Sequence, residues 1–219
     1  MKKLLLAAII LTTGFTAQAQ DFKDVLTKTF TAFDTTWVYE TKLQQANKLN
    51  LIAKKFNTEW AAQYYAAYAQ TQLSFNEAVA KDVAKRDGLL DEAGTYLAEA
   101  IRLAGKETDE THVLAAMIAN ARIGIDPQKR WQKYGKVFDS ELDAAKEINP
   151  DNPRMYILKG ISKRYTPKFF GGGKAAAKPY FEKAIALLAK ESKDDILKPY
   201  WGTQMAGWFM KEIEGKDEE

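Results

Sequence analysis

Apolar residues recur at helical spacing along almost the whole chain beyond its first twenty residues. The clearest case spans residues 36–56, where Val38, Leu43, Leu49 and Phe56 fall on one broad face and lysines and glutamines lie opposite. Alternating runs of apolar and polar residues, flanked by the turn sequences of β-hairpins, are missing. The pattern therefore predicts an all-α protein.

Proline and its neighbours mark several helix boundaries. Asp126-Pro127 and Asn152-Pro153 each combine an N-cap residue with proline at the first helical position, where the missing N–H costs nothing. Asn149-Pro150 closes the preceding helix, because proline disfavours the α conformation of the residue before it. We expect helices to begin near 127 and 153 and one to end near 148.

A spacing of small and large apolar residues repeats along the chain. It occurs at residues 93–100, in part at 142–145, and again at 177–184, and the final alanines are 45 and 39 residues apart. Repeats of this length indicate stacked helix pairs. The small residues let a partner helix approach closely, and the large ones fill the groove between neighbouring pairs.

The repeat resembles the alanine, aromatic, alanine pattern of the second tetratricopeptide (TPR) helix, and Tyr156 with Gly160 fits the first. A group of secreted TPR-like proteins of Gram-negative bacteria, without an assigned activity, resembles residues 40–208 in four successive segments: AKKFNTEWAAQYYAAYA, INPDNPRMYILKG, FFGGGKAAAKPYFEKA and KPYWG. The resemblance implies a TPR-like α-α superhelix of stacked antiparallel helix pairs and a role in protein interaction. We expect a C-terminal capping helix containing Trp201, Trp208 and Phe209.

The N-terminus has the features of a secretory signal peptide. Two lysines precede an apolar run and the small-residue pattern Ala17-Gln18-Ala19, which predicts cleavage after residue 19. The apolar run is shorter than the about 20 residues that a membrane-spanning helix needs. We therefore expect one helical-repeat domain over residues 20–212, an acidic, frayed tail over 213–219, and no membrane span after cleavage.

The amino-acid composition restricts where the protein can be located and which classes of partner it can bind. The chain has no cysteine, so it has no disulfide and no lipid-anchor residue, and we expect a periplasmic or secreted protein that is not a lipoprotein. The formal charge of +3 falls to +1 once Lys2 and Lys3 are removed with the signal peptide. A nearly neutral chain gives no reason to expect nucleic acid or a polybasic membrane anchor.

The run Gly171-Gly172-Gly173-Lys174 invites comparison with a phosphate-binding loop. It lacks the Walker spacing, because Lys168 stands where the first glycine belongs and Ala175 where the hydroxyl belongs. Either the glycines allow a turn between paired helices, or the helix N-terminus and Lys174 bind an anion. Because Pro179 would lie inside a helix that begins at the glycines, the helix must start later, near Lys178, or bend.

Two constellations are candidates for binding. Tyr64, Tyr65 and Tyr68, with Trp60, form an aromatic stripe that either packs one helix pair against the next or lines a groove. Residues 152–181 carry seven basic side chains and no acid: Arg154, Lys159, Lys163, Arg164, Lys168, Lys174 and Lys178. These basic residues either serve an acidic ligand or pair with the acids of residues 139–151.

No set of catalytic residues is recognisable. His112 is the only histidine, so neither a multi-histidine metal site nor a cysteine–histidine pair exists, and no serine lies in a nucleophile-elbow context. Carboxylate pairs across a cleft cannot be identified from spacing along helices. We expect no enzyme activity, no cofactor and no metal.

The sequence therefore favours a non-enzymatic, exported TPR-like scaffold that binds a peptide or an envelope or secreted protein on its concave face. The alternative is a receptor for a small molecule or anionic glycan that uses an aromatic groove and the 154–178 basic segment. The residues that we expect to contribute to binding are Tyr64, Tyr65, Tyr68, Arg154 and Lys174.

The turn interpretation of the glycine run leads to a prediction. Lys174→Ala should leave the midpoint of thermal unfolding unchanged within experimental error, because a lysine beside a turn contributes little to stability. Differential scanning calorimetry measures this, and a large drop in the midpoint would show that Lys174 is tied into the fold.

Overall fold

The computed structural model describes residues 21–215, which are helical and contain no strand. The predicted signal peptide and residues 216–219 of the predicted tail lie outside the described residues. The elements are, in chain order, a helix over residues 21–35, α2 (Tyr39–Lys55), α3 (Trp60–Ser74), the 3-10 helix η1 (Glu77–Val79), α4 (Val83–Ala104), α5 (Asp109–Ile125), α6 (Pro127–Ile148), α7 (Pro153–Tyr165), the 3-10 helix η2 (Lys168–Phe170), α8 (Lys174–Leu188) and α9 (Thr203–Glu214). The prediction of an all-α protein is confirmed.

The helix boundaries predicted from proline are confirmed. The side chain of Asp126 accepts a hydrogen bond from the backbone N–H of Lys129 at the start of α6, and that of Asn152 accepts one from Arg154 at the start of α7. These caps satisfy N–H groups that have no partner within the helix. In contrast, α8 begins directly after Gly173 and contains Pro179, so it does not start later as one of the two expectations had it.

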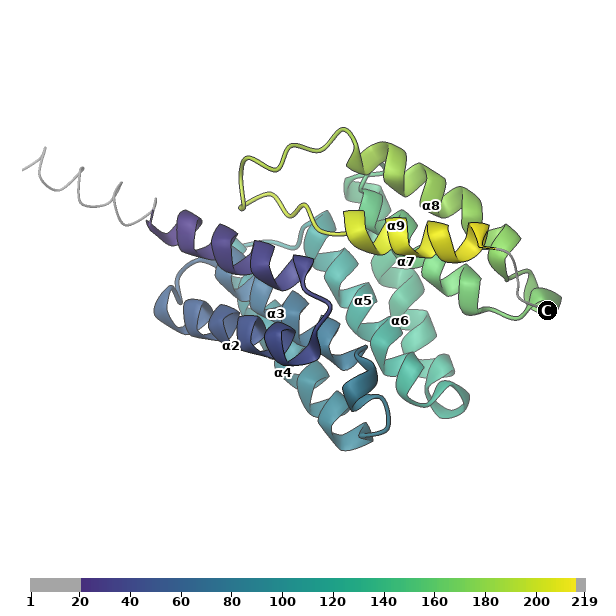
Figure 1. Cartoon of the computed structure of the whole chain (residues 1–219), viewed down its shortest axis with the longest axis horizontal. Coiled ribbons are helices and arrows are strands. Elements are labelled where there is room, and N and C mark those ends of the chain that lie inside the picture. Colours follow the sequence, from purple (N-terminus) through teal and green to yellow (C-terminus); the bar gives the residue numbers. More distant parts are fainter. Residues whose placement is uncertain (1–20, 216–219) are drawn as a thin grey trace, which may run out of the picture.

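Three consecutive helix pairs, α3–α4, α5–α6 and α7–α8, make up the body of the molecule (Figure 1). The repeated residues lie on the second helix of each pair and are buried: Ala93, Leu97, Ala100, Leu142, Ala145, Ala177, Phe181 and Ala184. The first helices form a row in which α3 contacts α5 and α5 contacts α7. The small residues therefore do what the spacing predicts, since they bring packed helices close together.

Residues 189–202, which we call the strap, connect α8 to α9 without helical structure. The strap runs back toward the N-terminal helix before it returns to α9 (Figure 1). Asp195 pairs with Lys23 at 3.0 Å, and the ring of Tyr200 lies 5.5 Å from that of Phe30. Trp201 belongs to the strap and is fully buried, so the expectation that it lies within the capping helix is wrong, whereas Trp208 and Phe209 do lie in α9.

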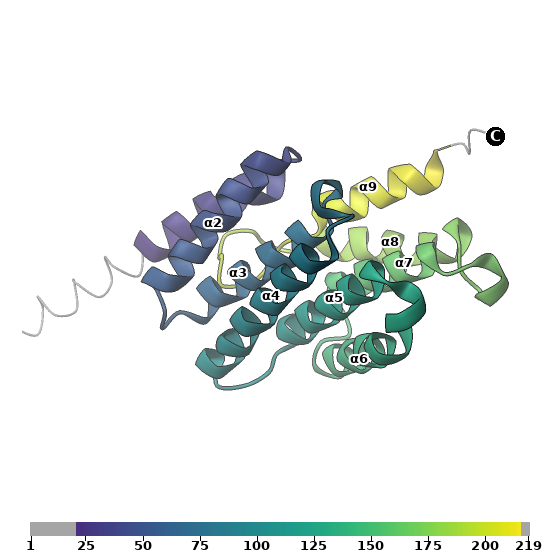
Figure 2. The same cartoon turned by 90° about the horizontal axis from the view of Figure 1, so that it is seen from below.

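The side chains of the described residues pack into a large core and a smaller one. The large core centres on α3, which is buried on nearly all sides, and the smaller one joins α7, α8 and α9 through Ile157, Phe181 and Phe209. Figure 2 shows the α7–α8 connection at the end of the molecule opposite the N-terminal helix. Among residues 21–215, no helix has both the length and the apolar character that crossing a membrane requires.

Close packing of α7 on α8 gives a stability prediction. A methyl group added at Gly160 would lie 2.8 Å from the ring of Phe181, which is fully buried. We expect Gly160→Ala to lower the free energy of unfolding by about 1–3 kcal/mol, measured by urea denaturation.

The matched control is Gly94→Ala on α4, where no atom lies within 4 Å. There the better helix propensity of alanine should leave stability unchanged or raise it by up to about 1 kcal/mol. Equal effects at the two sites would contradict the packing argument.

Candidate functional site

The three tyrosines proposed for binding lie in the large core. Tyr64, Tyr65 and Tyr68 are at most 2% exposed. The ring of Tyr65 lies 4.4 Å from that of Phe30, and the ring of Tyr68 lies 4.8 Å from that of Trp201. The packing interpretation of this stripe is confirmed, and a role in ligand binding stays a prediction.

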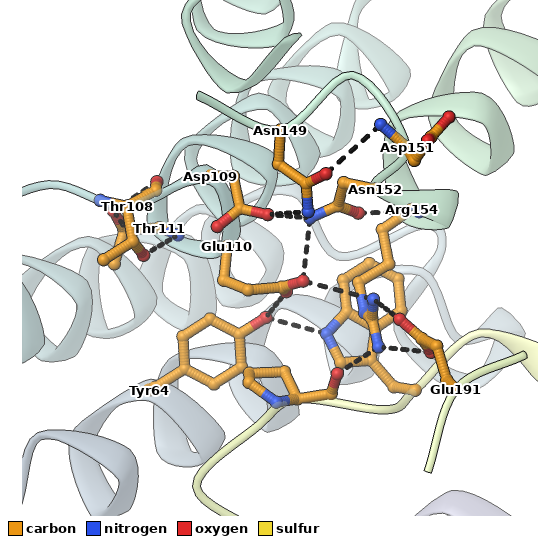
Figure 3. Close-up of polar contacts among 12 residues, drawn as sticks. Tyr64, Thr108, Asp109, Glu110, Thr111, Asn149, Asp151, Asn152, Arg154 and Glu191 are labelled. Atoms are coloured by element: carbon orange, nitrogen blue, oxygen red, sulfur yellow. Dashed lines mark hydrogen bonds and ion pairs between the residues drawn. The ribbon is translucent and has the colours of Figure 1, made fainter. Parts of the chain in front are cut away.

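Arg154 is buried beneath the strap, with only 1% of its surface exposed. Its guanidinium donates to both carboxylate oxygens of Glu191, at 2.8 and 3.0 Å, and to the backbone carbonyl of Pro199. It also lies 5.5 Å from the ring centre of Trp201. Arginine suits this position because its planar donors match a carboxylate and its face stacks on an indole. Arg154 thereby fastens the strap to α7 (Figure 3).

Glu110 of α5 lies on the other side of Arg154, at 3.1 Å from its guanidinium. Its carboxylate accepts hydrogen bonds from the Tyr64 hydroxyl at 2.9 Å and from the Asn152 amide at 2.8 Å (Figure 3). The indole N–H of Trp201 donates to the same hydroxyl at 2.8 Å. Because the Glu110 side chain is only 13% exposed, burial raises the pKa of its carboxyl to about 7, against the opposing effect of Arg154.

This network joins α3, α5, α7 and the strap around one arginine and two carboxylates. It brings together four of the five side chains chosen from the sequence, because Tyr65 and Tyr68 pack beside Tyr64 and Trp201. The position that a ligand was expected to take is filled by the chain's own Trp201. The sequence carries no signal for this, since the strap contacts are between residues far apart in the chain.

The glycine loop is built as a close turn between α7 and α8. Gly171 and Gly173 have φ angles of 77° and 97°, which favour glycine, and a Cβ at Gly172 would lie 2.0 Å from the carbonyl oxygen of Thr166. The N–H of Gly172 donates to the backbone carbonyl of Pro167, and that of Gly173 to the carbonyl of Lys163 in α7. Those two groups are therefore engaged, and anion binding by Lys174 stays a prediction.

The basic segment is compensated in a different way from the one expected. Of the expected kind, one pair forms, between Lys159 and Asp143 at 4.0 Å. Arg164 and Lys174 both approach Glu212 of α9. Acids from α9, α8, α5 and the strap replace most of the acids of residues 139–151. Lys163 and Lys168 form no ion pair with any of the residues 21–215.

An exposed aromatic surface lies where α7 ends beside α9. Tyr165 is 66% exposed and Trp208 is 49% exposed, and both rings contact Phe209, at centroid distances of 6.3 and 4.8 Å. Phe209 in turn stacks on buried Phe181 at 5.0 Å. We call Tyr165, Phe209 and Trp208 the ring surface. Two exposed rings packed on a buried apolar base can bind a flat apolar molecule by stacking.

The guanidinium of Arg164 borders the ring surface, 5.6 Å from the ring centre of Tyr165. It donates to both oxygens of Glu212, at 2.8 and 2.5 Å, which holds α9 against the end of α7. In the sequence, Tyr165 lies within the basic segment, and Trp208 was expected in the capping helix. Sequence reasoning did not place both beside Phe209, because the position of α9 against α7 depends on the path of the strap.

His112 is a structural residue in this arrangement. Its Nδ1 lies 2.7 Å from a carboxylate oxygen of Glu141, its Nε2 lies 3.7 Å from Glu107, and its side chain is 13% exposed. Within residues 21–215, no cluster of three or more histidine, cysteine or acidic side chains could hold a metal ion. Thr108 caps the helix that carries His112.

The chain is similar to a known binding protein. The HusA haemophore from Porphyromonas gingivalis matches with a TM-score of 0.73 and 32% sequence identity, over 90% of this chain and 95% of that chain. No protein-family model matches the sequence. No curated protein matches it either.

The buried carboxyl of Glu110 predicts how stability depends on pH. Because its pKa is raised from 4.5 to about 7, the folded protein keeps a proton that the unfolded chain releases. The stabilisation is present below pH 4.5 and is lost as the pH rises through about 7. Between about pH 5 and 8, the free energy of unfolding of the wild type should fall by roughly 2 kcal/mol relative to that of Glu110→Gln. Urea denaturation at a series of pH values measures this, and parallel pH profiles would contradict a raised pKa.

Proposed function

Since this chain belongs to the family of the HusA haemophore, we propose that it is an exported, non-enzymatic protein that binds haem or a closely related porphyrin. The observation that carries the proposal is the 32% identity over nearly the whole haemophore chain. The predicted signal peptide supports export to the periplasm or beyond. Of the two functions that the sequence raised, this is the small-molecule receptor.

The ring surface fits the chemistry of such a ligand. A porphyrin is a flat apolar ring, and haem carries carboxylates at one edge. The exposed rings of Tyr165 and Trp208 offer stacking, which is strongest when rings are offset or tilted. Lys163 and Lys168, which lie on either side of Tyr165 in the chain, offer positive charge to carboxylates.

Recognition through the macrocycle is favoured over recognition through the iron. The chain has one histidine and no cysteine, which are common iron ligands, and His112 is engaged by Glu141. The hydroxyl of Tyr165 is the one candidate iron ligand on the ring surface. We assign the affinity to stacking and charge, with Tyr165 acting through its ring.

The arrangement of the helices is part of the same proposal. The three stacked pairs, with the repeated small residues on α4, α6 and α8, support a TPR-like superhelix. The strap fills the first-helix row around Arg154 and Trp201, so peptide binding at that place has less support than ligand binding at the ring surface.

Haem titration of the mature protein, residues 20–219, tests the proposal. We expect Tyr165→Ala and Trp208→Ala each to weaken haem binding by up to about tenfold, because each loses one stacking ring. Tyr165→Phe should bind as the wild type does, since it keeps the ring and loses only the hydroxyl. The matched control is Trp37→Ala, which removes an equally open ring, 66% exposed, from the loop before α2.

Absorbance titration in buffer without lipid gives the dissociation constants for haem. Failure of the wild type to bind haem or metal-free porphyrin would overturn the function. Binding that is unaffected in both alanine variants would move the site away from the ring surface. A loss of affinity in Tyr165→Phe would instead assign iron ligation to that hydroxyl.

A further inference from the structure

The connection between α7 and α8 exposes two adjacent phenylalanines. Phe169 is 91% exposed and Phe170 is 71% exposed, and their rings lie 5.2 Å apart. They are the two most exposed large apolar side chains among residues 21–215. Paired exposed apolar side chains at one end of a molecule mark an interaction site.

The backbone holds these rings outward in a braced turn. The N–H groups of Phe170 and Gly172 both donate to the carbonyl of Pro167, and the N–H of Gly173 donates to the carbonyl of Lys163. Replacing Gly172 would force the turn apart, because its Cβ position falls on the backbone of Thr166. Residues 166–173, which we call the hairpin, therefore present Phe169 and Phe170 without folding them back onto the core.

The charge around the hairpin is positive. Residues 152–181 contain no acid, and Lys163 and Lys168 make no ion pair with any described residue. The acids that face this end belong to other elements: Glu182 on α8, and Glu212 and Glu214 on α9. These three pair with Arg164, Lys174 and Lys178, which leaves Lys163 and Lys168 available for an anionic partner.

We propose that the hairpin docks the protein on an anionic lipid bilayer. Phe169 and Phe170 enter the boundary between headgroups and acyl chains, and Lys163 and Lys168 contact lipid phosphates. Apolar tips flanked by lysines suit this boundary, because the rings leave water while the charges stay in it. The overall charge of the chain gave no hint of this, because the balancing acids lie elsewhere.

Docking by the hairpin would bring the ring surface to the bilayer, since Tyr165 directly precedes the hairpin in the chain. An amphipathic porphyrin dissolves in lipid, so the protein would meet its ligand there. This link to the ligand rests on the proposed function, whereas docking itself does not.

Vesicle sedimentation of the ligand-free mature protein tests the docking. Vesicles of phosphatidylcholine mixed with phosphatidylglycerol should bind the wild type, and vesicles of phosphatidylcholine alone should bind it more weakly. The double variant Phe169→Ser, Phe170→Ser should lower the partition coefficient at least about tenfold. Its control is Phe75→Ser, which removes a 41% exposed phenylalanine elsewhere. Lys168→Glu should weaken binding to the anionic vesicles, and Lys81→Glu, an exposed lysine before α4, should not.

Circular dichroism of each variant establishes that it is folded. Equal vesicle binding by the wild type and the double variant would overturn the proposal, as would no binding by the wild type. A haem titration without vesicles runs in parallel. Haem binding without vesicle binding would reject the docking and keep the function, and vesicle binding without haem binding would do the reverse.

Discussion

The buried guanidinium of Arg154 is the contact on which the C-terminal third of the molecule depends. It neutralises Glu191 of the strap and lies against Trp201, so it decides where the strap crosses the first-helix row. Removing one partner from a buried ion pair leaves a charge without compensation, at a cost of about 3–5 kcal/mol. The strap leads directly into α9, and α9 carries Trp208 and Phe209. The position of the ring surface therefore depends on how Arg154 holds the strap at Glu191 and at Trp201.

The sequence correctly predicted those features of the fold that depend on contacts between residues close together in the chain. The starts of α6 and α7 follow from Asp126 and Asn152, whose side chains cap N–H groups only two or three residues away. The spacing of small residues predicted the second helix of each pair, because close packing of neighbouring helices needs it at regular intervals. These interactions act over a few residues, and the sequence shows them directly.

The path of the strap and the assembly of the ring surface could not be predicted from the sequence, because both depend on contacts between distant residues. Trp201 and Tyr64 are 137 residues apart, and an aromatic stripe has the same sequence pattern whether solvent or another segment covers it. The prediction that the acids of residues 139–151 compensate the basic segment was wrong for most of these residues, for the same reason: Glu212 pairs with Arg164 because α9 folds back beside α7. Neither contact has a signal in the spacing of residues along the chain.

Burial divides the aromatic side chains into two groups with different roles. Those around Arg154 have their polar atoms largely engaged within the protein, and they hold helices together. At the other end of the molecule, Tyr165 and Trp208 stay exposed although each contacts the packed ring of Phe209. Each of these two rings is carried by a helix, and Arg164 with Glu212 locks the two helices together. A stacking site built this way loses little conformational entropy when a flat ligand binds, because its rings are already in place.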